Sequence, residues 1–334
     1  MTGKLDREAL AAVLAATGAD DAAVETGPAY GEDAAAIDLT GAASTLVVAA
    51  DPLSLAAQAV GELAVHIACN DVAASGADPR WLTHTLFLPD DDPGRLRTVT
   101  EQVDATARDL GVAIVGGHTE VLPSLERPLC SMTALGTTDR FVSSGGAEPG
   151  DRLLLTKGAG IEATAILATD FRAECAEAGV SAATLDSAAA FLDEVSVVPD
   201  AAAVRDAATA MHDPTEGGLL TALVETAAAT GSGTVLAVER DRVPVRPETR
   251  ACCAALGVDP LATFGSGALL AAAPPERVDE ATDALAAAGI AVGEIGEVRA
   301  ADDDADSDAG AVLLDGERIE EPPRDELYPF WESA

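Results

Sequence analysis

Lysine is nearly absent from this sequence. Its 334 residues include 20 Lys or Arg against 57 Asp or Glu, and the only lysines are Lys4 and Lys157. Proteins bind nucleic-acid phosphates through clustered cations, so a net charge of -37 without a basic cluster argues against a nucleic-acid partner. The acids are spread along the whole chain, which is typical of a halophilic surface, since molar salt shortens the Debye length to about 3 Å. A surface that binds a basic partner would instead concentrate its acidic residues in one block of the sequence.

Long apolar runs are missing too. No stretch approaches the roughly 20 uninterrupted apolar residues of a membrane span, so we expect no membrane segment. The first 20 residues lack the basic start and cleavage site of a signal peptide, which predicts a cytoplasmic protein. The length and the 48% hydrophobic content allow a large core and indicate two domains rather than one.

Paired cysteines are also lacking. The cysteines are odd in number and show no C-x-x-C spacing, which argues against a disulfide framework or a zinc site. We expect buried, unreactive thiols at all five positions, Cys69, Cys130, Cys175, Cys252 and Cys253. His66 and Cys69 could share one helix face as metal ligands, but a single pair is a weak signal.

Small and apolar residues dominate positions 61–79, which predicts a closely packed helix that stops near Gly76. Asn70 and Asp71, both poor helix formers, sit in the middle of this helix. A carboxylate buried among alanines is costly unless a cation or hydrogen-bond donors meet it. Asp71 therefore either has such a partner, for which a metal ion is the obvious candidate, or faces solvent.

Further acidic residues follow predicted loops and strand ends in the first half. Asp33 lies in a glycine-started loop, and Asp51 directly follows a predicted strand at 46–50. Open α/β layers commonly bind ligands just past the carboxyl ends of strands. A strand at 112–115 runs into a turn with Gly116 and Gly117, which permit close backbone approach to a ligand.

This turn adds a fourth carboxylate, Glu120. Clustered carboxylates repel one another, and in an acidic protein a hard cation is needed to hold them together. Magnesium prefers a few carboxylates plus phosphate oxygens, so the cluster implies a nucleotide or a phosphate ester. The predicted metal ligands are Asp33, Asp51, Asp71 and Glu120.

The second half supplies features that suit an anion. Lys157 lies in a glycine-rich loop that opens a helix, where it is either a phosphate contact or an ordinary surface lysine. Asp213 and Pro214 predict a sharp helix start followed by Gly217 and Gly218, and helix starts favour anions. Asp213 is either part of the site or a plain cap.

The order of predicted strands and helices describes two mixed α/β layers. A polar bridge at 143–151 separates a first domain, residues 1–140, from a second at 150–300. The remainder, 301–334, holds an acidic loop, a tail and a hairpin at 312–319 whose tight turn is Asp315-Gly316.

Five motifs in family order resemble the aminoimidazole ribonucleotide (AIR) synthetase superfamily. They span nearly the whole chain: the loop at 31–35, the strand end at Asp51, residues 70–77, residues 116–120 and residues 212–218. Within that superfamily, the Asp-Pro-Thr-x-Gly-Gly motif and residues 243–272 look most like the hydrogenase maturation protein HypE.

The resemblance implies an α/β (α+β) fold with two domains. In this fold the N-terminal mixed sheet joins the same sheet of a second subunit, and the two sheets form a barrel at the centre of a homodimer. It implies ATP and Mg²⁺ bound at the four acids, with Gly116, Gly117, Thr119, Asp71 and Lys157 contacting the nucleotide. Asn70 and Asp213 match positions near the reacting groups. The implied reaction transfers the γ-phosphoryl group of ATP to an amide-type or other oxygen of an unidentified small or peptide-borne acceptor.

One departure concerns the end of the sequence. HypE-type proteins end in a cysteine that carries a carbamoyl group, whereas no cysteine follows Cys253 here. Two alternatives therefore stay open beside the enzyme. One is a non-catalytic nucleotide-binding scaffold, and the other is a thiamine-monophosphate kinase.

Overall fold

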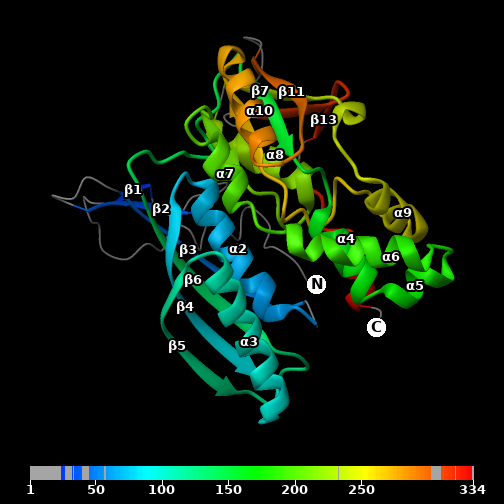
Figure 1. Ribbon diagram of the computed structural model, residues 1–334. Helices are drawn as coiled ribbons and strands as arrows, with labels where there is room; N and C mark the ends of the chain where they lie inside the picture. Colours follow the sequence, from blue (N-terminus) through cyan, green and yellow to red (C-terminus); the bar gives the residue numbers. More distant parts are fainter. Residues whose placement is uncertain are drawn as a thin grey trace.

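Backbone hydrogen bonds divide the chain into two sheets, one in each half of the sequence (Figure 1). The computed structural model describes residues 24–26, 32, 34–39, 45–55, 58–231, 233–301, 310–319 and 321–332. Asp33 lies outside these ranges. The first sheet ends at Thr138 and the second begins at Arg152, and the predicted domain limits at 140 and 150 fall within this connection.

The first sheet has the strand order β1-β2-β3-β6-β4-β5. Only the β4–β5 pair is parallel among its described strands, so the sheet is mixed, as the sequence predicts. The parallel strands are joined through α3, the crossover helix that such a connection requires. The strands are β1 (Val24–Thr26), β2 (Ala35–Asp38), β3 (Thr45–Leu53), β4 (Asp78–Leu88), β5 (Ala113–Val121) and β6 (Leu129–Thr138).

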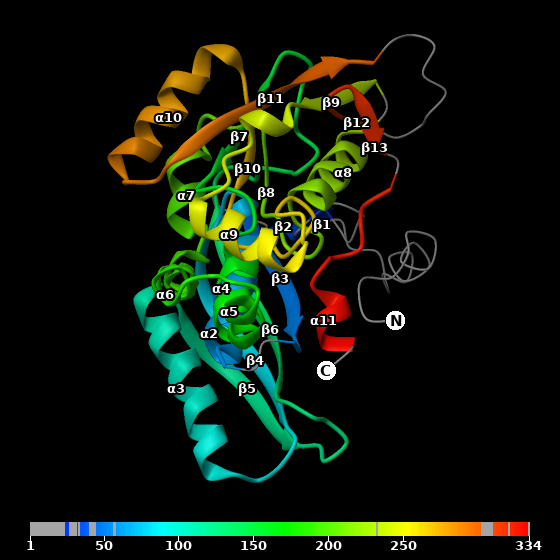
Figure 2. The same cartoon turned by 90° about the vertical axis from the view of Figure 1, so that its right-hand side faces the viewer.

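Helices α2 (Val60–Ala74) and α3 (Pro93–Asp109) lie against this sheet (Figures 1 and 2). The prediction for α2 is confirmed: the helix is buried except at Glu62 and His66, as its small apolar residues require. A Cβ atom at Gly61 would come within 2.5 Å of the Val99 carbonyl oxygen, so glycine permits the close α2–α3 contact.

Two strands run further than the sequence predicts. β3 continues through Asp51 to Leu53 and pairs with β6 along its whole length. β5 continues to Val121, so the segment 116–120 lies in a strand and not in a turn. Those two predictions were wrong because pairing with a neighbouring strand overrides the local turn preference of glycine and proline.

The second sheet has the strand order β13-β12-β9-β11-β7-β10-β8. The hairpin is confirmed: Asp315 and Gly316 have φ of 53° and 85°, as a two-residue turn with two positive φ angles requires. β12 pairs with β9, so the hairpin belongs to this sheet and is not a separate region. The strands are β7 (Arg152–Thr156), β8 (Ala210–His212), β9 (Thr234–Val238), β10 (Leu270–Ala273), β11 (Val292–Ala300), β12 (Ala311–Leu314) and β13 (Glu317–Ile319).

Helices cover both faces of the second sheet. Leu153 and Leu155 of β7 pack in one core with residues of α8 (Gly218–Thr230). Leu154, which points to the other face, packs in a second core with residues of α7 (Val198–Val204) and α10 (Val278–Ala287). The end of α2 enters this second core through Ala73 and Ala74, so α2 joins the two halves.

A helical group beside the sheets holds the C-terminal segment (Figure 2). It comprises α4 (Ile161–Thr169), α5 (Arg172–Glu177), α6 (Ala182–Ala189) and α9 (Pro247–Leu256). Helix α11 (Tyr328–Glu332) packs on it through an aromatic cluster of Phe171, Phe264, Tyr328, Phe330 and Trp331. Short 3-10 helices complete the chain: η1 (Ala190–Glu194), η2 (Arg240–Arg242) and η3 (Pro275–Arg277).

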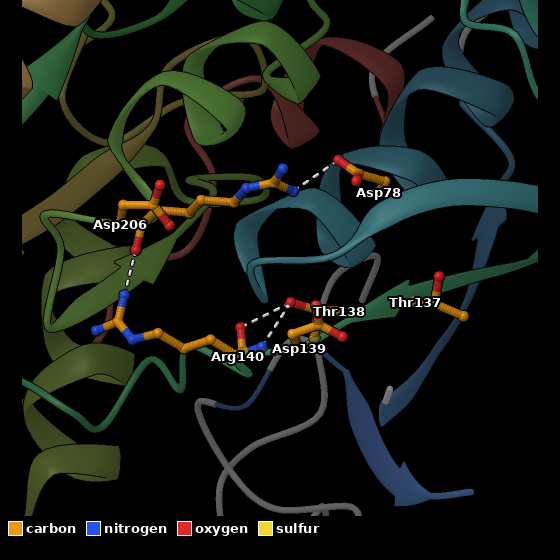
Figure 3. Close-up of a pocket in the computed structure, with 7 residues that line it drawn as sticks. Asp78, Thr137, Thr138, Asp139, Arg140 and Asp206 are labelled. Atoms are coloured by element: carbon orange, nitrogen blue, oxygen red, sulfur yellow. Dashed lines mark hydrogen bonds and ion pairs between the residues drawn. The ribbon is translucent and has the colours of Figure 1, made fainter. Parts of the chain in front are cut away.

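A polar pocket of about 330 Å³ lies where the two halves meet (Figure 3). Arg205 of the second half pairs with Asp78 of β4, with 2.6 Å between Nη1 and Oδ1. The Arg140 guanidinium donates hydrogen bonds to the carbonyl oxygens of Arg205 and Ala208. The cations of this pocket therefore hold the halves together.

All five cysteines are buried and free, as predicted. Burial raises the pKa of the Cys69 thiol to about 12, and the nearby Asp71 charge adds to the effect. A thiol with so high a pKa is a poor nucleophile at neutral pH. In the ranges that the structure describes, no helix is both long and apolar enough to cross a membrane.

Candidate functional site

Helix α2 carries Asn70 to the junction of the two halves. The Asn70 side chain is fully buried. Its Nδ2 donates to the Val195 carbonyl oxygen at 2.9 Å, and its Oδ1 accepts from the Val197 amide at 2.8 Å. The side-chain amide thus satisfies two backbone groups of the other half. This positioning contact is what the geometry assigns to Asn70, and the catalytic role stays a prediction.

Replacing Asn70 with alanine is expected to lower the free energy of unfolding by about 2–4 kcal/mol, because two buried backbone groups lose their partners. Chemical denaturation followed by circular dichroism measures this change. Glu101→Ala, at an exposed position on α3, is the control and is expected to change stability by less than about 0.5 kcal/mol. Equal stability of the two variants would contradict a bridging role for Asn70.

Two predicted metal ligands lie on or beneath α2. Asp71 follows Asn70 on the helix and is 8% exposed. Asp51 is half-buried on β3 and alternates onto the same face as Val47 and Ala49, which pack in one core with α2. The Asp51 charge contributes to raising the pKa of Glu162 in the second half, so Asp51 lies in a region shared by both halves.

The predicted metal ligand Glu120 and the predicted nucleotide contacts Gly116, Gly117 and Thr119 lie on the edge strand β5. All nine residues of β5 are exposed, and the Glu120 side chain is 53% exposed beside His118. Gly117 is opposite His84 of β4, whose carbonyl oxygen would lie 2.7 Å from a Cβ atom at this position. Gly117 therefore permits close strand packing, whereas a Cβ atom at Gly116 would make only an ordinary contact with the neighbouring strand. Thr119 is exposed on the same strand.

The predicted cluster of four carboxylates is not assembled in one copy of the chain as far as the structure describes it. No group of three or more His, Cys, Asp or Glu side chains among the described residues is arranged to hold a metal ion. Asp71 lies on the helix layer and Glu120 on the exposed edge strand, and Asp33 is outside the described ranges. The four-carboxylate metal site stays a prediction.

Lys157 has a left-handed backbone, with φ of 55°, and its ammonium group is held inside the protein. Nζ lies 3.0 Å from Asp200 Oδ2 and donates to the carbonyl oxygens of Glu194 and Ser196 at 3.1 and 2.6 Å. The ammonium group therefore has three oxygen neighbours, two through hydrogen bonds and one through an ion pair. A phosphate contact would require one of them to be exchanged, and Lys157 is not an ordinary surface lysine.

Asp213 is buried but does not cap α8, so that prediction was wrong. The helix begins at Gly218 with Gly217 as its N-cap, and both have positive φ. A Cβ atom at Gly218 would come within 2.4 Å of the Thr263 carbonyl oxygen, so packing of the glycine pair sets the helix start. The Gly217 amide donates instead to Asp325 Oδ2 at 2.8 Å, which brings a carboxylate from the C-terminal segment to this helix start.

Sequence reasoning missed two buried carboxyl groups, Glu162 and Asp325. Burial raises the pKa of Glu162 to about 7, with Asp325 and Asp51 adding repulsion. Burial likewise raises the pKa of Asp325 to about 7, despite hydrogen bonds from the amides of Leu327 and Gly217. The acidic residue at the start of the otherwise apolar helix α4 was a signal for Glu162, whereas the sequence around Asp325 offered none.

Comparison with known proteins agrees with this architecture. Residues 31–138 match the N-terminal domain, and residues 148–307 the C-terminal domain, of AIR synthase related proteins. Carbamoyl dehydratase HypE of Cupriavidus necator is 33% identical over 259 residues, which cover 72% of this chain and 68% of that protein. Carbamoyl dehydratase HypE of Azotobacter vinelandii is 34% identical over 245 residues, which cover 71% of this chain and 68% of that protein.

Solved structures show the same two-domain arrangement. A crystal structure of hydrogenase maturation protein HypE in complex with ATP is 29% identical to this chain, with a TM-score of 0.70. The match covers 87% of this chain and 89% of the HypE chain. The structure of AaThiL complexed with AMPPCP and TMP has a TM-score of 0.72 at 21% identity, and the match covers 89% of this chain and 91% of the AaThiL chain. This likeness shows a shared fold.

The two mixed sheets, joined by the buried helix α2 that carries Asn70 and Asp71, define a two-domain α/β protein of the AIR synthase-like class. The chain belongs to the family of AIR synthase related proteins and is HypE-like within it. The resemblance that rests on the five motifs is thus confirmed, as is the fold class.

Proposed function

We propose that this protein is an enzyme that transfers the γ-phosphoryl group of ATP, with magnesium, to an amide-type or other oxygen of a small or peptide-borne acceptor. One observation carries the proposal: a HypE that is 29% identical was crystallised in complex with ATP, and the match covers 89% of that chain. Asp51, half-buried on β3, and Asp71, 8% exposed on α2, support it, since carboxylates largely shielded from water suit a bound cation.

The donor chemistry of these acids fits magnesium. Mg²⁺ binds through one or two carboxylates and takes its remaining oxygen ligands from water and substrate phosphates. Asp51 and Asp71 would hold the ion, with Asp33 and Glu120 as further ligands, and a bound ion would neutralise charge on the phosphates. Gly116, Gly117 and Thr119 are proposed to contact the nucleotide, and Asp213 to position the acceptor.

A homodimer is part of this proposal. Exposed large apolar side chains gather on β5, the edge strand of the first sheet: Ile114 is 38%, Val115 59% and Val121 42% exposed. An exposed apolar edge strand is a ready surface for pairing with another chain. Pairing along β5 would cover these residues and place Glu120 at the interface.

Val115→Lys is expected to convert the dimer to a monomer, because a charge at the centre of the apolar edge would be buried on pairing. Light scattering after size-exclusion chromatography measures the mass of both proteins. Leu96→Lys, at an exposed apolar position on α3, is the matched control and should leave the dimer intact. A parent protein that is monomeric at high concentration would contradict the dimer.

Magnesium-dependent ATP consumption by the purified protein in molar potassium chloride tests the activity. Carbamoyl compounds, thiamine phosphate and purine-pathway substrates are supplied as acceptors, one at a time. Product formation from one acceptor would support the enzyme and identify that acceptor. Tight ATP binding without turnover under every condition would favour the scaffold, a nucleotide-binding protein without chemistry.

A further inference from the structure

A cavity of about 250 Å³ lies between α4 of the second half and the first turns of α2, where α3 also contributes. Leu63, Ile166 and Leu192 give it apolar walls, and three acidic residues, Glu62, Glu162 and Asp170, also line it. A volume of this size is below the range of about 300–1,000 Å³ typical of sites for drug-sized ligands. The cavity therefore suits a small molecule and not a nucleotide.

The Glu162 carboxyl is the unusual feature of this cavity. Its side chain is 3% exposed; Oε2 lacks a partner with good hydrogen-bond geometry, and Ser266 is the neighbour whose hydrogen bonding partly offsets the effect of burial on the Glu162 pKa. A buried carboxylate oxygen without a partner costs free energy, which a ligand that donates a hydrogen bond would recover. Burial also raises the pKa of Glu62, with the charge of Asp193 adding to the effect.

The lining offers acceptors and negative charge but no cation. In the described part of the chain, none of the residues around this cavity is Lys, Arg or His. The Gln102 amide is engaged elsewhere, since Nε2 donates to the Gln58 carbonyl oxygen at 2.8 Å and Oε1 accepts from the Gly61 amide at 3.1 Å. A ligand that fits must itself donate hydrogen bonds and carry positive charge.

We propose that this cavity binds a small organic cation, with an ammonium or guanidinium group at Glu162 and a short apolar chain against Leu63 and Ile166. A charge-assisted hydrogen bond to a buried carboxylate is stronger than one between neutral groups, so the cation provides the selectivity. The apolar walls favour such a molecule over a divalent metal ion, which requires several oxygen ligands. This site goes beyond the proposed function and does not require ATP.

Calorimetric titration at pH 8 without nucleotide tests the proposal with n-butylamine, which is protonated at this pH, and with n-butanol, its neutral analogue. We expect n-butylamine to bind and n-butanol not to bind. Glu162→Gln keeps the size of the side chain and should weaken n-butylamine binding by about tenfold or more.

Glu101→Gln, at an exposed position outside the cavity, is the matched control and should bind like the parent. Equal binding of n-butanol, unchanged affinity of Glu162→Gln, or no n-butylamine binding by the folded parent would each overturn the proposal. Because nucleotide is omitted, a protein that failed to bind ATP could still pass this test, so the two proposals can fail separately.

Discussion

Asp71→Asn is expected to lower magnesium-dependent ATP turnover by about 100-fold or more, with little loss of stability. The substitution keeps the shape of the side chain and removes the negative charge proposed to hold the metal ion and, through it, the phosphates. Removing one group that stabilises transition-state charge typically costs on this order. Initial rates of ATP consumption at several magnesium concentrations measure the effect.

Asp283→Asn is the matched control for this experiment, since Asp283 is exposed on α10 and far along the chain from α2. It should turn over ATP like the parent. If Asp71→Asn were folded and equally active, Asp71 would be a structural residue, and the metal role would fall to other acids.

Glu162→Gln is expected to make the protein more stable at pH 8 by about 3 kcal/mol and to change little at pH 5, because each tenfold change in proton affinity is worth about 1.4 kcal/mol. Burial raises the pKa of this carboxyl from 4.5 to about 7, next to Asp325 and Asp51. Between those values the folded state holds a proton that the unfolded state has lost, so parent stability falls as the pH rises.

Denaturation midpoints of parent and variant, measured from pH 5 to pH 8, test this prediction. Asp325 is retained in both proteins, so the difference between them reports Glu162 together with its repulsion of Asp325. Glu101→Gln should follow the parent at every pH. A difference that did not change with pH, or a variant less stable at pH 8, would show that Glu162 does not carry a raised pKa in the folded protein.

Elements with strong local signals were predicted well from the sequence. Helix α9 begins at Pro247 and ends before Gly257, which has a left-handed backbone, so both of its limits follow from local signals in the sequence. The hairpin turn at Asp315-Gly316 was also predicted from its own two residues. In α2, the small and apolar residues around Asp71 predicted a closely packed helix, and all but Glu62 and His66 are buried. Such features depend on residues only a few positions apart.

Contacts between distant parts of the chain could not be predicted. Asn70 bonds to backbone groups 125 and 127 residues further along, and no pattern near Asn70 indicates them. Asp325 at the start of α8 is a contact of the same kind, across 108 residues. Lys157 could be singled out by its rarity, but its contacts with the segment 194–200 depend on how the second half folds.

The central claim is that this protein binds ATP through magnesium held by acidic side chains. Isothermal titration calorimetry of the parent with ATP, with and without magnesium and in molar potassium chloride, tests it most directly. We predict saturable binding that requires magnesium and is lost in Asp71→Asn but kept in Asp283→Asn. No binding by the folded parent, or binding that is equally tight without magnesium, would contradict the claim.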